Sequence, residues 1–244
     1  MGGEAILGKY MATKAIILAA GKGDRLFPIT METPKPLLEV NGEKLIESLI
    51  RGMIKQGICE IFVITGYKKE QFAYLQQIYT QVKLVYNPFF ETCNNISSLY
   101  VAREYLGDCI IADGDQLLKN VQIVNPRFDS SGYCSAWVEE TSEWLQQVDE
   151  GGFVLSCSKY GGKKGWQLFS LSFWTRFDGE KLKRHVEELF EKEKLTNIFW
   201  DDIPMFYRKG EYRLKIREIS HGDIVEIDTI QDLIEIEGNY DDRC

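Results

Sequence analysis

The chain has little of what marks several classes of protein. It contains only two histidines, His185 and His221, and its six cysteines lack C-x-x-C spacing and lie far from both, which argues against structural zinc. No apolar run approaches the length of a membrane-spanning helix. Nucleic acid and anionic membrane surfaces need a basic stripe, but the formal net charge is -8. We therefore expect no nucleic-acid or membrane partner, and any anion site must be local.

The length and apolar content are those of a globular protein. With 244 residues, of which 44% are hydrophobic, the chain can bury a core. Residues 1–13 carry neither a long apolar core nor an arginine-rich face, so we expect a leader or linker there and a single domain over residues 14–240. Scattered thiols without a signal peptide favour the reducing cytoplasm.

An early glycine-rich stretch predicts a phosphate-binding loop. Residues 15–20 form an apolar run that suits a strand buried on both faces of a parallel sheet. Gly21 and Gly23 follow, and glycines let backbone N–H groups approach a ligand closely. Arg25 adds a planar charged fork, and Lys35 adds a point charge between two prolines. The sequence therefore predicts a polyphosphate ligand here.

Two common nucleotide motifs do not fit this loop. A dinucleotide-binding turn, G-x-G-x-x-G, would need glycine in place of Leu26, and a P-loop would need G-K-[ST] where the chain has Gly23, Asp24 and Arg25. The full string A-A-G-x-G-x-R-L, followed by P-K-P-L, instead resembles the signature of the nucleotidyltransferase family that makes nucleoside-diphosphate sugars and alcohols.

The first half of the chain alternates between strand and helix patterns. Apolar runs at residues 15–20, 60–66 and 82–86 predict strands, and residues 44–56 and 68–81 carry apolar side chains at helical spacing. This order predicts an α/β fold with a Rossmann-like central sheet, mixed but mainly parallel, flanked by helices and with ligands at the carboxyl ends of the strands. The resemblance implies the sheet of nucleotide-diphospho-sugar transferases.

The second half favours hairpins over crossovers, in a β-rich region that would cover the nucleotide site and bind the acceptor. Glycine-rich turns separate the first three of its predicted strands. The predicted strands are residues 133–140, 153–157, 167–174, 211–219 and 223–227, and the predicted helices are residues 179–194 and 229–237.

Acidic residues end two of the predicted strands. Asp113 and Asp115 flank a glycine after an apolar run, which fits either a solvated turn or a Mg²⁺ site, since Mg²⁺ prefers a few carboxylates plus substrate oxygens. The family resemblance implies that Asp115 holds Mg²⁺, with Asp113 beside it at the nucleotide. It also implies that Asp228, which ends I-V-E-I-D, is the second metal ligand.

A polar junction, E-T-C-N-N-I-S-S-L-Y, precedes a predicted helix that runs to about residue 106. Asn95 or Ser97 could cap that helix, or could recognise a pyrimidine edge through amide and hydroxyl groups. The N-N-x-x-S pattern resembles part of the cytosine pocket in the cytidylyltransferase branch of the family. The residues expected to bind the nucleotide are Leu18, Ala19, Ala20, Gly21, Gly23, Asn95, Ser97 and Asp113.

Five tryptophans suggest an aromatic cage. Trp137 and Trp174 lie in strand-like runs and are expected in the core, whereas Trp144, Trp166 and Trp200 stand near polar or charged residues. Indole faces beside carboxylates suit a quaternary ammonium such as choline, which cation–π attraction can hold.

A combination of six motifs, A-A-G-x-G-x-R-L, P-K-P-L, N-N-x-x-S-L-Y, S-x-E-W, F-W-D-D and V-E-I-D-T-I-Q-D-L, resembles bacterial CTP:phosphocholine cytidylyltransferases over nearly the whole chain. The resemblance implies CTP and phosphocholine as substrates, with the acceptor bound by Trp144, Trp166, Trp200 and Asp201. Two departures, a lysine-rich hairpin at residues 161–165 and the D-D pair, keep 2-aminoethylphosphonate open, since its primary ammonium would prefer carboxylates. A sugar-1-phosphate is a further alternative.

The resemblance implies in-line attack of an acceptor phosphate oxygen on the α-phosphorus of CTP, with pyrophosphate leaving. Because that phosphate is already ionised, no general base is needed, and catalysis depends on positioning and charge neutralisation. We expect Arg25 to stabilise the leaving pyrophosphate and Lys35 to draw the two anions together. A non-catalytic nucleotide-binding regulator would not need these cations. The expected assembly is a monomer or small homo-oligomer.

Overall fold

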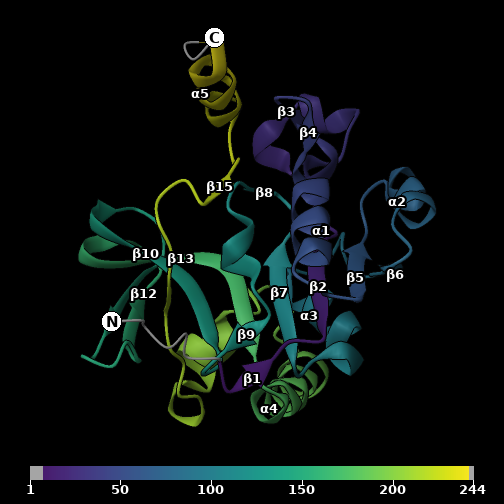
Figure 1. The fold of residues 1–244 in the computed structure, drawn as a ribbon. Helices are drawn as coiled ribbons and strands as arrows, with labels where there is room; N and C mark the ends of the chain where they lie inside the picture. Colours follow the sequence, from purple (N-terminus) through teal and green to yellow (C-terminus); the bar gives the residue numbers. More distant parts are fainter. Residues whose placement is uncertain (1–7, 242–244) are drawn as a thin grey trace.

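A computed structural model describes residues 8–241 of the chain and the side chains of residues 8–236. Within this part a nine-stranded mixed sheet forms the centre of the molecule (Figure 1). Its strands are β2 (Lys14–Ala19), β5 (Glu60–Thr65), β6 (Val82–Tyr86), β7 (Cys109–Asp113), β10 (Gly132–Thr141), β11 (Leu145–Val148), β12 (Val154–Ser158), β13 (Gly162–Trp174) and β14 (Arg217–Glu218). β7, β2, β5 and β6 pair in parallel, in that order, and β13 joins antiparallel to β7. The predicted mixed sheet is confirmed.

Helices cover both faces of this sheet (Figure 1). The covering helices are α1 (Leu45–Lys55), α2 (Ala73–Ile78), α3 (Ile96–Ala102) and α4 (Arg176–Glu187), whereas α5 (Ile230–Asp241) stands apart from the sheet at the top of Figure 1. Successive side chains of β2 point to opposite faces, as in any strand. Ala15 and Ile17 therefore join the core cluster that contains α1, and Ile16 and Leu18 join the one that contains α3 and α4. Across residues 8–241, none of the helices has both the length and the apolar character needed to cross a bilayer.

The second half of the sheet is antiparallel except for the short β10–β14 pair, as the hairpin pattern predicts. Three short ladders lie outside it: β1 (Tyr10–Met11) with β9 (Arg127–Phe128), β3 (Glu39–Val40) with β4 (Glu43–Lys44), and β8 (Gln116–Leu118) with β15 (Ile224–Glu226). The last ladder matters most for function. Its register pairs Glu226 with Gln116, so the residue two beyond β15 lies beside the residue that precedes β8.

Several local predictions are wrong. Residues 68–81 form a 3-10 turn followed by the six-residue α2 rather than one long helix. Residues 211–219 contain only β14, because their backbone N–H groups bond singly to separate segments, as Lys215 does to Ser131 and Ile216 to Gly152. Trp137 is 47% exposed, on the open face of β10, whereas Trp174 is buried as predicted.

Part of the predicted leader belongs to the fold. Tyr10 and Met11 pair with β9, and the backbone N–H of Ala12 donates to the carbonyl of Pro126 at 2.8 Å. Residues 1–7 of the predicted leader lie outside the described residues.

Candidate active site

The glycine loop follows β2 at the carboxyl ends of the parallel strands, where the fold predicts a ligand. A cavity of about 450 Å³ opens there and is lined by Leu18, Ala19, Ala20, Gly21 and Gly23, among others. Gly23 has a φ of 70°, which favours glycine, and a Cβ there would lie 3.0 Å from the Cβ of Lys35. A Cβ at Gly21 would meet nothing within 4 Å. The geometry of the loop itself therefore requires only Gly23 to be glycine.

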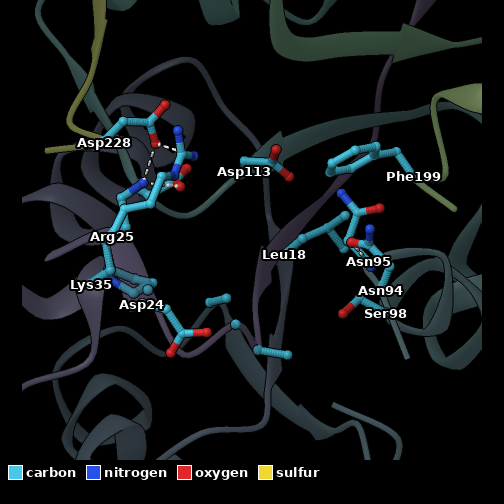
Figure 2. A pocket seen from close by; sticks show the side chains of 16 residues that line it. Leu18, Asp24, Arg25, Lys35, Asn94, Asn95, Ser98, Asp113, Phe199 and Asp228 are labelled. Carbon is cyan, nitrogen blue, oxygen red and sulfur yellow. Dashed lines mark hydrogen bonds and ion pairs between the residues drawn. The ribbon is translucent and has the colours of Figure 1, made fainter. Parts of the chain in front are cut away.

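Two cations and two carboxylates form a bridge at one end of the cavity (Figure 2). Lys35 Nζ donates to Asp115 Oδ2 at 2.7 Å and to Asp228 Oδ1 at 2.6 Å. Arg25 Nη2 donates to the same Asp228 oxygen at 2.8 Å. Burial lowers the pKa of Lys35, but the two carboxylates outweigh it, so the pKa is raised overall and the ammonium stays charged. The structure thus brings together four predicted site residues from distant parts of the sequence.

Short segments position this bridge. Lys35 begins a 3-10 turn between two prolines, and its side chain is only 8% exposed. Asp115 follows Gly114, whose N–H donates to the carbonyl of Leu18 at 2.8 Å, and a Cβ at Gly114 would lie 3.1 Å from that same oxygen. The glycine therefore lets the acidic turn approach β2. Asp228 comes from the residues that follow β15.

Asp115 and Asp228 fit half of a Mg²⁺ site. Each presents an oxygen to the same point, which Lys35 Nζ holds. Among the described residues, no group of three or more acidic, histidine or cysteine side chains is arranged to hold a metal ion. Mg²⁺ usually takes one or two carboxylates and completes its shell with water and phosphate oxygens. The pair therefore suits an ion that arrives with a nucleotide.

The opposite side of the cavity carries amides, a hydroxyl and an aromatic ring, from Asn94, Asn95, Ser98 and Phe199 (Figure 2). Asn95 Oδ1 accepts a hydrogen bond from the backbone N–H of Trp200 at 2.9 Å. The Asn95 side-chain NH₂ has no partner within the described part of the chain. It is a hydrogen-bond donor suited to a base carbonyl.

Ser97, one of the predicted base contacts, does not line the cavity. It is 1% exposed, and its Oγ donates to the carbonyl of Asn94 at 2.8 Å and accepts from Asn87 Nδ2 at 2.9 Å. Neither predicted cap is formed, because Asn95 takes the N-cap position of α3 with helical angles and no side-chain cap bond. Counted along N-N-x-x-S, the serine is Ser98, so the pattern itself indicated the residue that reaches the cavity.

A second cavity, also of about 450 Å³, opens beside the first. Both are lined by Arg25, Asn95, Asp113, Asp115, Phe199 and Asp228. The second is further lined by Glu143, Trp144, Leu168, Ser170, Asp201 and Glu226. These shared walls make the two cavities one continuous cleft, with room for two ligands side by side.

Three carboxyl groups in this second cavity have raised pKa values. Burial raises the pKa of Asp201 to about 7 and that of Glu226 to about 7. Burial, followed by the charge of Asp115, raises the pKa of Asp113 well above its ordinary value. Glu226 accepts a hydrogen bond from Gln116 Nε2 at 2.7 Å, whereas Asp201 Oδ1 forms no hydrogen bond of ordinary geometry within residues 8–236, although the buried Tyr133 hydroxyl lies beside this carboxyl group. Asp201 Oδ1 is therefore a buried acceptor atom at the wall of this cavity that a donor on a ligand could satisfy.

The structure does not bring the three predicted cage tryptophans together. Trp144 lines the second cavity. Trp200 is 1% exposed and packs in the core, with its ring 5.9 Å from that of Tyr133, because its neighbour Phe199 is the residue that faces the cleft. Trp166 lies near the amino end of β13 and pairs with Trp137 of β10. The two tryptophans line a separate pocket.

The wall around Trp144 contains partners that the sequence pattern did not reveal. The ring of Phe199 meets that of Trp144 edge-on, with centroids 6.1 Å apart. Lys159 Nζ pairs with the buried carboxylate of Asp202 and lies 5.3 Å from the Trp144 ring centroid. Asp202 is therefore engaged by the protein itself, and only the first aspartate of the D-D pair faces the cavity.

Comparisons with known proteins identify the family of the chain. The family described as nucleotidyl transferase matches residues 14–120. A 2-aminoethylphosphonate cytidylyltransferase of Lancefieldella rimae is 34% identical over 93% of both chains. A choline-phosphate cytidylyltransferase of Streptococcus pneumoniae is 35% identical over 92% of this chain and 96% of its own.

The solved structure of the CTP:phosphocholine cytidylyltransferase from Streptococcus pneumoniae has the same fold. It matches with a TM-score of 0.87 at 34% sequence identity, over 93% of this chain and 98% of that one. These relatives are enzymes, which removes the support for a non-catalytic regulator. The chain belongs to the nucleotidyltransferase family and is a cytidylyltransferase.

Proposed function

We propose that the chain transfers the cytidylyl group of CTP to 2-aminoethylphosphonate and releases pyrophosphate. The observation that carries this proposal is Asp201, which is 5% exposed, lines the second cavity and leaves Oδ1 without a hydrogen bond of ordinary geometry in the described residues. A buried acceptor atom without a donor costs roughly 1–3 kcal/mol. A primary ammonium carries three N–H donors, so such a ligand would compensate this carboxylate.

The other lining residues also favour an ammonium that can donate hydrogen bonds. Glu143 and Glu226 line the same cavity, and neither forms an ion pair in the described part of the chain. The aromatic contribution is limited to Trp144 and Phe199, because Trp200 lies in the core. The lysine-rich hairpin at residues 161–165 lines neither cavity. Carboxylates therefore outnumber aromatic rings around the acceptor.

Phosphocholine is the second candidate, and one observation favours it. Trp144 and Phe199 form an edge-on pair within the cavity. Such rings attract a trimethylammonium by cation–π interaction, at roughly 0.5–2 kcal/mol per ring. A trimethylammonium has no N–H, however, and would leave Asp201 Oδ1 unbonded. A sugar-1-phosphate carries no cation and would leave the cavity's carboxylates uncompensated.

In the proposed reaction a phosphonate oxygen of the acceptor attacks the α-phosphorus of CTP, and the bond to the pyrophosphate oxygen breaks. Asn94, Asn95 and Ser98 would hold the base at one side of the cleft, so that the triphosphate reaches Lys35 and Arg25 at the other. These cations would lower the repulsion between the two anions and stabilise the leaving pyrophosphate. A Mg²⁺ ion bound to Asp115 and Asp228 would add charge neutralisation at the phosphate oxygens.

The test is pyrophosphate release with CTP and Mg²⁺ across four acceptors. Phosphoethanolamine and phosphocholine differ only in the three methyl groups on nitrogen, and 2-aminoethylphosphonate differs from phosphoethanolamine only in its phosphonate. Glucose-1-phosphate serves as a control without a cation. We expect kcat/KM for both primary amines to exceed that for phosphocholine, with the phosphonate highest. A preference for phosphocholine would overturn this choice and establish the second candidate.

A further inference from the structure

A small pocket of about 210 Å³ lies away from the cleft, near the amino end of β2, where β9 pairs with β1 (Figure 1). Its charged lining comes from Arg127, Asp129, Lys215 and Arg217, and its apolar floor from Phe128 and Phe173. It shares no lining residue with either cavity of the candidate active site. The six residues of β2 separate the two regions by on the order of 20 Å.

Arg217 is the central cation of this pocket. Its guanidinium carbon lies 4.3 Å from the ring centroid of Phe173, and Nη1 donates to the carbonyl of Asn125 at 2.9 Å. Burial lowers its pKa. Within the described chain, the charge of Asp129 acts on Arg217 but no carboxylate lies within ion-pair distance, and its remaining N–H groups have no hydrogen-bond partner. A guanidinium presents five N–H donors in a planar fork that matches phosphate oxygens, so most of its donors are available.

The fold holds this cation and its neighbour in place. Arg217 belongs to β14, which pairs in parallel with β10 at Cys134. Two residues earlier, the N–H of Lys215 donates to the carbonyl of Ser131 at 2.9 Å. Gly132 permits this close approach, since a Cβ there would lie 1.7 Å from the carbonyl oxygen of Lys215. The pocket is therefore built on paired backbone rather than on a free loop.

The charge of the pocket opposes that of the chain. Three cations and one carboxylate give its lining a formal charge of +2, in a protein whose net charge is -8. The carboxylate, Asp129, already accepts a hydrogen bond from the backbone N–H of Lys9 at 3.2 Å. Neither Arg127 nor Lys215 forms an ion pair among residues 8–236, although Lys215 Nζ lies 5.6 Å from the ring centroid of Phe153, which does not line the pocket. The lining thus lacks the anion that would balance it.

We propose that this pocket binds a small oxyanion of the phosphate class. Its volume is below the roughly 300–1,000 Å³ of pockets that take drug-sized ligands, so a whole nucleotide is too large. Inorganic phosphate and pyrophosphate share the required chemistry. β13 provides Phe173 here and both Leu168 and Ser170 in the acceptor cavity, so a bound anion would contact the strand that walls the active site. This site is independent of the proposed acceptor.

Calorimetric titration of the full chain with inorganic phosphate, and separately with pyrophosphate, tests the proposal. A background carrying Arg25→Met and Lys35→Met removes the phosphate-binding cations of the cleft. In that background we expect one equivalent of anion to bind still. Adding Arg217→Met should raise its Kd at least about tenfold, since charge-assisted hydrogen bonds are lost. The anion with the lower Kd, phosphate or pyrophosphate, is the one that the pocket prefers.

Two controls keep the result interpretable. Retained cleft binding of CTP by Arg217→Met in the otherwise unchanged chain shows that the variant is folded. Should that variant fail to fold, the double substitution Arg127→Met with Lys215→Met removes the other two cations of the pocket and should weaken anion binding instead. Binding of neither anion in the double-variant background, or binding that these substitutions leave unchanged, would overturn the proposal.

Discussion

The cleft has two sides: the proposed nucleotide side at the first cavity and the proposed acceptor side at the second. Their charged residues are paired in opposite ways. On the nucleotide side, Lys35 and Arg25 already pair with Asp115 and Asp228. On the acceptor side, the buried carboxylate of Asp201 forms no ion pair in the described part of the chain. A ligand on the first side must therefore break the ion pairs of Lys35 and Arg25. A ligand on the second side must instead provide a cation for Asp201. This difference suggests that the first side governs rate and the second governs choice of acceptor.

The largest expected effect comes from breaking the nucleotide side. We expect Lys35→Met to lower kcat/KM by about 10²–10³-fold, as loss of a charge that stabilises a transition state commonly does. Thermal unfolding should change by only a few degrees, since Asp115 and Asp228 remain partly exposed. Lys22→Met is a matched control, because Lys22 lies in the neighbouring glycine loop, is exposed and lines neither cavity. Near-normal turnover of the Lys35 variant would remove the catalytic role.

The next effect concerns acceptor choice. Asp201→Asn keeps the shape of the side chain but removes its charge, so we expect the acceptor KM to rise about tenfold or more while the KM for CTP stays unchanged. Glu143→Gln, on the exposed rim of the same cavity, should change either constant far less. Steady-state kinetics with both substrates varied measures this. A rise confined to the KM for CTP would contradict the assignment of the two sides.

The acceptor side should also depend on pH. Burial raises the pKa of Asp201 to about 7, so the carboxylate is mostly neutral at pH 6 and mostly charged at pH 8. An aliphatic ammonium stays protonated throughout, and the acceptor KM should therefore fall by about tenfold between these values. The profile of Asp201→Asn should be shallower across this range, with the remaining dependence due to Glu226, whose pKa is also raised to about 7, and to the acceptor's own phosphonate. An equally steep profile in that variant would assign the dependence to another group.

A smaller effect is expected at the aromatic wall. Trp144→Leu removes one ring from the cavity, so turnover of phosphocholine should fall roughly 2–30-fold relative to that of 2-aminoethylphosphonate. The ratio of kcat/KM for the two acceptors, measured on one preparation, cancels any loss of folded protein. Equal losses for both would mean that the ring shapes the cavity without recognising the head group.

The smallest effect is on stability, and its direction follows from the same carboxyl group. The folded pKa of Asp201, about 7, lies above its ordinary value of 3.8, so the folded state binds the proton more tightly. The contribution of Asp201 to stability is therefore present below about pH 4 and is lost as pH rises toward 7. We expect Asp201→Asn to melt a few degrees above the unchanged chain at pH 8, with the gain shrinking by pH 5. Melting curves at both values would decide.

Much of the nucleotide side could be predicted from the sequence because its residues lie in contiguous motifs. Gly23, Arg25 and Lys35 stand within one short stretch, and β-strand and turn chemistry fix where that stretch must lie. Asp228 is different, since nothing in its local pattern indicates a partner 193 positions away at Lys35. Only the family resemblance connected them.

The acceptor side could be predicted less well because tertiary packing decides which neighbour faces the cleft. Local pattern cannot tell Phe199 from Trp200, and the core around Tyr133 takes the larger ring. Ser98 is different, since Asn87 Nδ2 donates to both Ser97 and Ser98 and the N-N-x-x-S spacing already pointed to the serine that lines the cavity. The choice between Phe199 and Trp200 depends on contacts between segments far apart in the chain, which one strand or helix pattern does not contain.

The link that Lys35 makes between Asp115 and Asp228 also bears on the order in which ligands bind. A divalent cation that bound alone would displace the Lys35 ammonium from both carboxylates. Because the Lys35 side chain is only 8% exposed, water could not replace those contacts. A triphosphate arriving alone would draw that ammonium away and leave two carboxylates facing one another. A nucleotide already chelated to its cation would replace both sets of contacts together, with Asp115 and Asp228 holding the cation and Lys35 meeting the phosphate oxygens. We therefore expect the chelate, rather than either component, to be the species that opens the catalytic cycle.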